Sequence, residues 1–263
     1  IVRDFTNNGT FNHNSGTVSF STAGTTLQNI AGSQSIIFNN LIINNSGGAT
    51  DVTNAMTPPA TISLLGTLSF GENNSVFDAD GAGGLDFILL STNDSPTADA
   101  RIAAITTAGS NITGNFTVQR FVSNEASGRF YRYIASPVVG ATVADLKSAI
   151  PVTGTFSDPS DGTSSPPCNG CIPSNPSLFF YNETSNAYVA YPTAGLASAN
   201  AFTNGRGYSA FFRHTGSGGV GNATINFVGT NPSTGNIALP VSPNASGFSL
   251  VGNPYPSAIR WDN

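Results

Sequence analysis

The sequence has few charged residues. Only 9% are Asp, Glu, Lys or Arg, whereas about 25% is usual for a soluble domain. Lys147 is the single lysine, and the formal net charge is −5. Because no basic cluster is present to neutralise phosphates, we expect no nucleic-acid partner.

Long apolar runs are missing as well. The sequence contains no stretch of about 18 or more apolar residues, so we expect no membrane insertion. The chain starts at Ile1 without the basic start and apolar stretch of a signal peptide. We therefore expect it to be a piece of a larger protein, truncated at its C-terminal end.

Asn, Ser, Thr and Gly supply the polarity that charged residues usually supply. These residues suit turns and exposed strand faces, and they are poor in helix interiors. With 39% hydrophobic residues and 18 Phe, the chain is not a disordered linker. The composition predicts an all-β protein, and the low lysine content is typical of a secreted, extracellular one.

A short strand pattern occurs twice in the first half of the chain, as GTVSF at 16–20 and as GTLSF at 66–70. Apolar residues around it alternate with polar ones, which is the period of a half-buried strand. Recurring strands separated by Asn, Gly and Ser predict a parallel β-solenoid (β-helix) over residues 1–115, with about 25 residues per coil. Val18 and Leu68 would then occupy equivalent inward positions two coils apart.

Asparagines of this region could stack as amide ladders at the corners of the coils. The candidates are Asn7 and the pairs Asn39–Asn40 and Asn44–Asn45. The repeat is imperfect, however, and Pro58–Pro59 interrupts it. The alternative is an antiparallel sandwich whose hairpins share turn residues.

Residues 116–263 have a different pattern, with many aromatics and no short repeat. One helix is expected near 141–150, with Thr142 as its cap and Asp145 three residues later. A hairpin is expected from 178–181 and 188–191. Short strands at regular spacing predict an antiparallel β-sandwich. The further strands are expected at 208–213, 223–228, 236–240 and 248–252, and a strand at 112–122 is expected to close the first half.

Several stretches resemble a module of large surface and adhesin-like proteins of Bacteroidota. They are ITGNFTVQRFV, GRFYRYIASPV, LFFYNETSNAYVAY and FSLVGNPYPSAIRWD. The stretches FNNLIINNSGG and GTLSF are similar to the β-solenoid repeats that often precede that module. The resemblance implies export by the type IX secretion system and a place at the cell surface. It implies no catalytic residue.

The stretch DADGAGGLD resembles a calcium-binding loop. Asp78, Asp80 and Asp86 stand at positions 1, 3 and 9, and the glycines between them could turn backbone carbonyls inward. The bidentate Glu of a full EF-hand loop is missing, because Leu89 takes that place. A plain turn rich in Asp and Gly is the alternative.

Cys168 and Cys171 form the only Cys-x-x-Cys of the chain. A structural zinc site needs four ligands, and no second Cys pair or nearby His is present. Prolines flank the pair, which disfavours a redox motif at a helix start. We expect a local disulfide, which indicates an oxidising compartment.

Signatures of catalysis are weak. No Gly-x-Ser-x-Gly occurs, and the two histidines, His13 and His214, have no evident partners. A polysaccharide lyase on the solenoid would combine acidic calcium ligands with a basic residue. Arg101, together with the three aspartates named above, is the candidate set for that chemistry.

Aromatics of the second half could form a platform on which sugar rings stack, although core packing is the alternative. They are Phe130, Tyr131, Tyr133, Tyr181, Tyr188, Tyr191, Tyr208, Phe211 and Phe212. The adjacent residues Phe179 and Phe180 must place one ring on each side of a strand.

Together these observations predict a non-enzymatic, structural or adhesive fragment of a secreted bacterial cell-surface protein. Its partners would be glycans, other surface proteins, or neighbouring copies in a fibre. No cofactor is expected besides calcium. The alternatives are a β-helix polysaccharide lyase or hydrolase, and a carbohydrate-binding module attached to such an enzyme.

Overall fold

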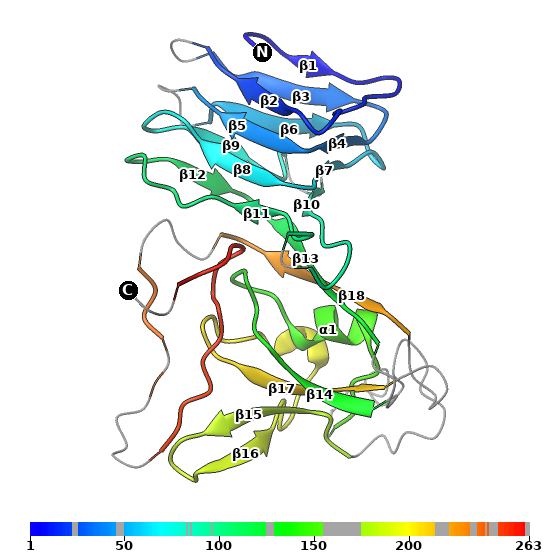
Figure 1. Cartoon of the computed structure of the whole chain (residues 1–263), viewed down its shortest axis with the longest axis vertical. Coiled ribbons are helices and arrows are strands. Elements are labelled where there is room, and N and C mark those ends of the chain that lie inside the picture. The colour runs from blue at the N-terminus through cyan, green and yellow to red at the C-terminus, as the bar shows by residue number, and fades with distance from the viewer. Residues whose placement is uncertain are drawn as a thin grey trace. The chain divides into compact units, whose positions relative to one another are not determined.

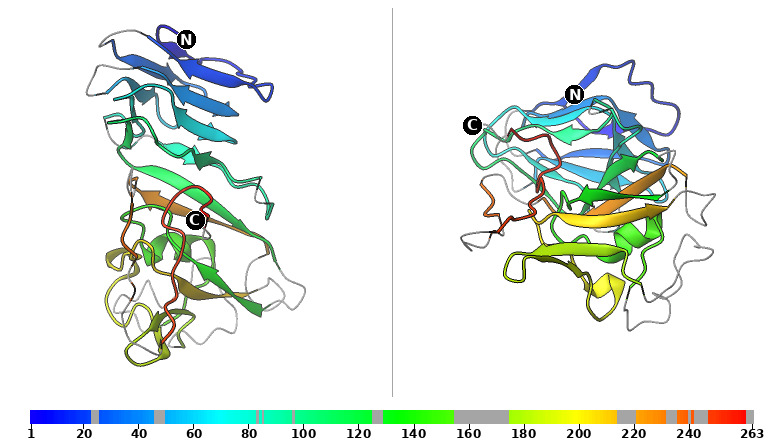
Figure 2. Two further views of the ribbon diagram at one scale, coloured as in Figure 1. Left: turned by 60° about the vertical axis from the view of Figure 1, so that its left-hand side comes forward. Right: turned by 60° about the horizontal axis from the view of Figure 1, so that its bottom comes forward.

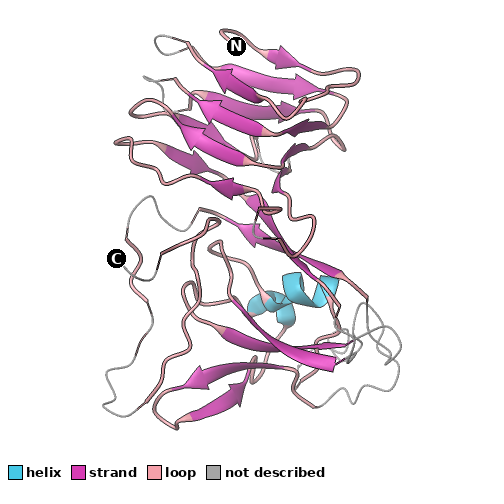
Figure 3. Ribbon diagram, in the orientation of Figure 1, coloured by secondary structure: helices cyan, strands magenta, loops and turns pink. Residues whose placement is uncertain are grey.

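In this computed structural model, the described part of the chain is all-β with one α-helix (Figure 3). The structure describes all residues except 23–25, 46–49, 83, 85, 96, 125–128, 155–174, 214–220, 232–235, 240, 242–246 and 261–263. Contacts between residues divide the chain into two compact units. The first consists of Ile1–Gln119, Gly229–Asn236 and Pro256–Asn263, and the second of Arg120–Val228 and Ile237–Tyr255.

The first unit is a parallel β-solenoid of about 4 turns, as the repeat predicted (Figure 1). Its strands belong to three parallel sheets. The first sheet contains β1 (Phe5–Thr6), β3 (Gln28–Gly32), β6 (Val52–Met56), β9 (Val76–Asp78) and β12 (Asn111–Thr113). The second contains β4 (Ile36–Phe38), β7 (Ile62–Leu64), β10 (Phe87–Leu89) and β13 (Phe116–Val122), and its fifth strand is β18 (Ala223–Gly229), next to β13. The third contains β2 (Thr17–Phe20), β5 (Asn40–Ile43), β8 (Thr67–Phe70) and β11 (Arg101–Ile102).

The register of the third sheet confirms the predicted equivalence of the two short repeats. Val18 pairs with Leu41, and Leu41 pairs with Leu68, so Val18 and Leu68 are two coils apart. Leu41 and Leu68 are fully buried, whereas Val18, on the first strand of this sheet, is half-buried. Since all these pairings are parallel, the alternative of an antiparallel sandwich is wrong for this half.

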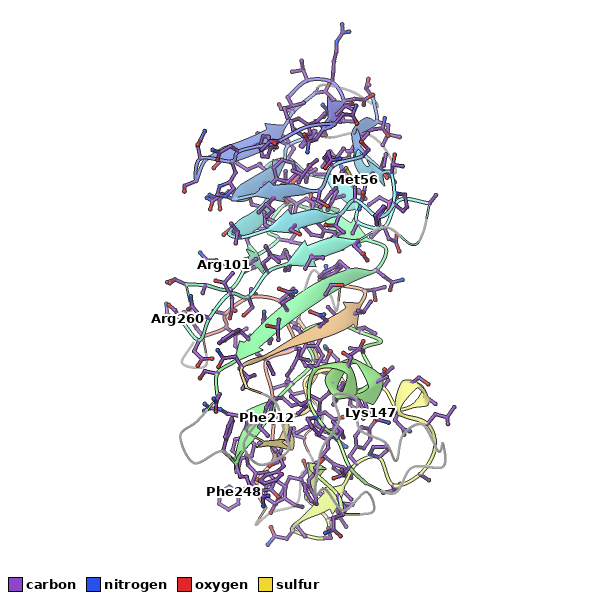
Figure 4. The ribbon with its side chains drawn as sticks, turned by 90° about the vertical axis from the view of Figure 1, so that its right-hand side faces the viewer. Met56, Arg101, Lys147, Phe212, Phe248 and Arg260 are labelled. Atoms are coloured by element: carbon purple, nitrogen blue, oxygen red, sulfur yellow. The ribbon has the colours of Figure 1, made fainter. Side chains whose placement is uncertain are left out.

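The interior of the solenoid is filled by aliphatic and aromatic side chains. Phe77 and Phe87 are fully buried and meet edge to face, with ring centroids 5.0 Å apart. Met56 is buried in the same interior (Figure 4). Pro58–Pro59 lies in the turn between β6 and β7, outside the strands, so it does not interrupt the stack.

A glycine divides one strand that the sequence predicted as continuous. The expected strand at 112–122 is in fact two strands, β12 and β13, on different sheets. Gly114 between them has a φ of +76°, which L-residues rarely adopt, and a Cβ there would lie 2.0 Å from an oxygen of Asp80. The chain therefore turns a corner at this point.

The second unit contains a four-stranded antiparallel sheet (Figure 2). Its strand order is β14 (Arg129–Ile134), β17 (Tyr208–Arg213), β15 (Leu178–Asn182) and β16 (Ala187–Ala190). The unit also contains α1 (Val143–Ala149), the short 3₁₀ turn η1 (Ala197–Ala199) and most of β18 (Ala223–Gly229).

The expected sandwich is not confirmed in the described part of this unit. The predicted strands at 236–240 and 248–252 are wrong for the residues that the structure describes there. Val251 makes only a single bridge, with Arg206. Strands need a partner of matching register, and sequence alternation alone does not supply one.

Two local predictions in the second unit are confirmed. The backbone N–H of Thr142 donates to the Asp145 carboxylate over 2.6 Å at the start of α1, as a capping box requires. β15 and β16 form the expected hairpin, and Asn186 at its turn has a φ of +52°. In the part of the chain that the structure describes, neither helical segment has the length and apolarity to cross a bilayer.

Candidate functional site

The corners of the solenoid are held by side chains that bond to the adjacent coil. Asn7 donates to the carbonyl of Gln34 over 3.1 Å, and Asn39 donates to the carbonyl of Ser15 over 3.0 Å. The amide of Asn54, which is buried, donates to the carbonyl of Ala79 over 2.9 Å. These amides bond mainly to the backbone of the neighbouring coil, not to one another. They therefore fasten the coils together without forming the expected amide ladders.

The acidic side chains of the calcium candidate also accept hydrogen bonds from the protein. Asp78, at the end of β9, accepts from the Thr53 hydroxyl over 3.0 Å and from the Gly81 backbone over 3.1 Å. Asp80 accepts from the backbone N–H of Asn115 over 2.8 Å. Burial, and then the neighbouring Asp80 carboxylate, raise the pKa of Asp78 above its usual value.

Asp86, the third member of the calcium candidate, is exposed just before β10, and its backbone carbonyl accepts from the N–H of Ile62. Among the described residues, no three His, Cys, Asp or Glu side chains come together to hold a metal ion. The calcium site stays a prediction.

Arg101, the basic member of the lyase candidate, belongs to a different sheet from Asp78. Arg101 opens β11, pairs with Thr67 and is exposed (Figure 4). Asp78 lies on β9, in the sheet that contains β6 and β12. The structure thus brings Asp78 and Asp80 together but places Arg101 on another face of the solenoid.

The other residues singled out in the sequence are the two cysteines and the two histidines. Cys168, Cys171 and His214 lie outside the described residues, so the disulfide stays a prediction. His13 accepts a hydrogen bond from the backbone N–H of Ser15 through its ring Nδ1, in a turn.

The aromatics of the second unit are sorted by strand alternation onto the two sides of the antiparallel sheet. Tyr131 pairs with Phe211, and Tyr181 pairs with Tyr188. Tyr133 and Phe179 both pair with Ser209. Directly paired residues, and residues two apart on one strand, point to the same side. We call this side the aromatic face: Tyr131, Tyr133, Phe179, Tyr181, Tyr188 and Phe211.

The opposite side of the sheet packs into the core of the second unit. Leu178, Tyr208, Ala210 and Phe212 are almost completely buried on that side. The ring of Tyr208 is buried, and its hydroxyl accepts a hydrogen bond from the backbone N–H of Thr203 over 2.9 Å. The alternative of core packing is therefore confirmed for Tyr208 and Phe212. It does not describe the exposed tyrosines of the aromatic face.

Three tyrosines of the aromatic face are open to solvent. Tyr131 is 56% exposed, Tyr133 is 68% exposed and Tyr188 is 48% exposed. Single exposed apolar residues are common, but several on one face of a sheet form a patch, and such patches mark interaction sites. This grouping is the feature of the second unit that most resembles a functional site.

The rings of the face form two contacting groups. In one, Tyr131 lies 4.9 Å from Phe211 and 6.5 Å from Phe179 between centroids, with interplanar angles of 46° and 54°. In the other, Tyr181 and Tyr188 meet edge to face at 5.4 Å. The rings of these pairs are inclined to one another, so the face is not the coplanar row that a flat platform would have.

A hydrogen bond between two hydroxyls links the edges of the sheet. The Tyr133 and Tyr188 hydroxyl oxygens are 2.9 Å apart, although β14 and β16 are separated by β17 and β15. The two side chains must lean across the intervening strands to meet. Ser209, the partner of Tyr133, is accordingly buried. The hydrogen bond between the two hydroxyls raises the pKa of Tyr188 to about 12.

Comparison with known protein families, with curated proteins and with solved structures gives no match for this chain.

Proposed function

We propose that the chain is a structural and adhesive part of a secreted bacterial cell-surface protein and that it does no catalysis. The solenoid would be a rigid scaffold, and the second unit would carry a binding surface for a partner outside the molecule. The observation that carries this proposal is the exposed aromatic face, because a sheet side bearing three open tyrosines is costly to leave uncovered.

The chemistry of the solenoid supports a scaffold. Its carboxylates accept hydrogen bonds from backbone or hydroxyl donors of adjacent coils, as Asp4 does from Asn29, Asp51 from Val76 and Asp80 from Asn115. A general acid or a metal ligand would need free oxygen atoms directed at a ligand. These residues are better explained as fasteners between coils.

The placement in a Bacteroidota surface protein exported by type IX secretion rests on the sequence resemblance. A parallel solenoid followed by a β-rich unit agrees with that arrangement, and solenoids serve enzymes and scaffolds alike. We favour adhesion over a polysaccharide lyase because Arg101 lies on a different sheet from Asp78.

The test is adhesion of the purified chain to surfaces of known composition. The chain would be applied to immobilised glycans, to bacterial cells and to itself on a sensor chip. We expect saturable binding to at least one of these surfaces. No binding to any of them would overturn the adhesive role.

A further inference from the structure

We propose that the aromatic face is a binding site for uncharged polysaccharide, with the exposed tyrosines stacking on sugar rings. This inference rests on the proposed adhesive function and assigns it a site and a class of ligand. Three features of the described residues carry it: the kind of apolar surface exposed, the absence of charge between the ends of the face, and the position of the hydroxyls.

The exposed apolar surface of the face comes from aromatic rings. Between Tyr131 and Tyr188 the face contains six aromatics, together with Ser209 and Ala190, and no Leu, Ile, Val or Met. Aliphatic side chains interlock with an irregular protein surface, whereas the π-face of a ring offers a flat apolar area. The C–H groups on one side of a pyranose ring form a matching flat apolar area.

The face carries no charge in its middle. Its eight residues named above are all uncharged. Arg129, at the start of β14, pairs with Arg213 at the end of β17, and Glu183 follows β15. Arg132, in the middle of β14, pairs with Ala210 and so belongs to the opposite side of the sheet. An acidic polysaccharide would need several cations along its path. The complementary ligand is therefore neutral.

Polar groups accompany the rings. The Tyr133 and Tyr188 hydroxyls lie together and are open to solvent, and the Tyr181 hydroxyl donates to the side chain of Asn186. Tyrosines supply large, rigid, amphipathic contact area at low cost in conformational entropy. Hydroxyls at the tips of the rings can exchange their mutual hydrogen bond for bonds to sugar hydroxyls at little net cost.

The spacing suits successive sugar units. Tyr131 and Tyr133 are two residues apart on β14, which corresponds to about 7 Å along a strand. That spacing is comparable with the length of one unit in an extended polysaccharide. The group of rings around Tyr131, and the group of Tyr181 and Tyr188 to which the Tyr133 hydroxyl is bonded, would then contact neighbouring units of one chain.

The experiment is a depletion assay with the full chain on insoluble cellulose, chitin and mannan, with soluble alginate as the acidic competitor. The double variant Tyr131→Ala/Tyr133→Ala is compared with Phe248→Ala. Phe248 is 79% exposed and lies outside the strands of the face, so its variant removes an exposed ring elsewhere in the same unit (Figure 4). Thermal unfolding of each variant shows whether it is folded.

We expect the wild-type chain to bind at least one neutral polysaccharide and alginate not to compete. The double variant should weaken binding about tenfold, because two exposed ring contacts are lost together. Phe248→Ala should bind as the wild type does. If the double variant does not fold, Tyr188→Ala gives the same comparison from the other edge of the sheet.

Three results would overturn the site. One is equal binding by the wild type and a folded double variant, in which case the adhesive function stands and the face does not carry it. Another is binding to alginate alone. The third is binding to cells that survives periodate oxidation of glycans but is lost after protease treatment, which would make a protein the partner.

Discussion

Val18 and Leu68 belong to one column of side chains in the solenoid, and Leu41 pairs with both of them. The column runs on to Ile102, which pairs with Leu68. Val18, in the first coil, is half-buried, whereas Leu41, Leu68 and Ile102 are buried. The solenoid is therefore stabilised by stacking, and each coil depends on its neighbours.

Truncation within this column should cost stability according to burial. We expect Leu68→Ala to lower the free energy of unfolding by about 2–5 kcal/mol, as is usual for a fully buried leucine. Val18→Ala should cost clearly less, because the side chain is already partly in water. Urea denaturation followed by circular dichroism measures both. Equal losses of unfolding free energy for the two variants would contradict the difference in burial between Val18 and Leu68.

Gly32 tests how tightly two coils approach each other. A Cβ at Gly32 would lie 2.0 Å from the backbone oxygen of Asn7, and its φ is +128°. Gly84 also has a positive φ, of +82°, but has open space around it. We expect Gly84→Ala to cost about 1–2 kcal/mol from backbone strain alone, and Gly32→Ala to cost more.

Gly9 completes this series, because nothing lies within 4 Å of a Cβ there and no positive φ restricts it. Gly9→Ala should leave the melting temperature nearly unchanged. A melting temperature for Gly32→Ala equal to that of Gly84→Ala would mean that the close approach of the coils does not restrict the residue.

The repeat and its inward positions could be predicted from the sequence because a solenoid makes neighbouring coils equivalent. GTVSF and GTLSF mark the same place on two coils, and alternation shows which residues point inward. The helix at Val143–Ala149 and the hairpin of β15 and β16 depend on local signals and were equally predictable. All of these features are specified by residues close together in the sequence or repeated along it.

The features that could not be predicted depend on residues far apart in the sequence. The segments around 236–240 and 248–252 alternate like strands, but the described residues there form no ladder, and Val251 makes only a single bridge, with Arg206. The aromatic face shows the same dependence. Alternation separates Tyr131 and Tyr133 from Phe130, but it does not say which side of the sheet meets the core. That choice is made by the packing of Tyr208 and Phe212, which lie far along the chain.

The raised pKa of Asp78 should make stability depend on pH. The folded state holds the proton of this carboxyl more tightly than the unfolded state, so ionisation destabilises the fold. Stability should fall as pH rises through the range just above about 3.9, the ordinary pKa of Asp. Asp78→Asn removes this contribution and keeps an oxygen that can accept from Thr53.

The quantity to follow is the difference in unfolding free energy between Asp78→Asn and the wild type. We expect it to shift in favour of the variant as pH rises from about 3 to about 7. Asp145 also has a raised pKa because of its burial, and it contributes equally to both proteins. A difference that is constant, or that shifts in favour of the wild type, would contradict the placement of Asp78 beside Asp80.

The hydroxyl pair on the aromatic face should be visible in a tyrosine titration. Tyr133→Phe keeps the ring and removes the hydrogen bond that is the main cause of the raised pKa of Tyr188. We expect the pKa of Tyr188 to fall from about 12 toward the ordinary value of about 10. Ultraviolet absorbance of tyrosinate follows the change, with Tyr131→Phe as the control. An unchanged titration after Tyr133→Phe would show that the two hydroxyls are not bonded.

We propose that this chain binds an external polysaccharide surface and does not cleave it. The most direct measurement follows binding and cleavage together, by incubating the chain with each polysaccharide and assaying retained protein and released reducing ends in the same sample. We expect saturable retention of the protein, with no release of reducing ends above that seen with heat-denatured chain. Release that depends on the folded chain and is abolished by Arg101→Ala would contradict it and would establish a lyase or hydrolase on the solenoid.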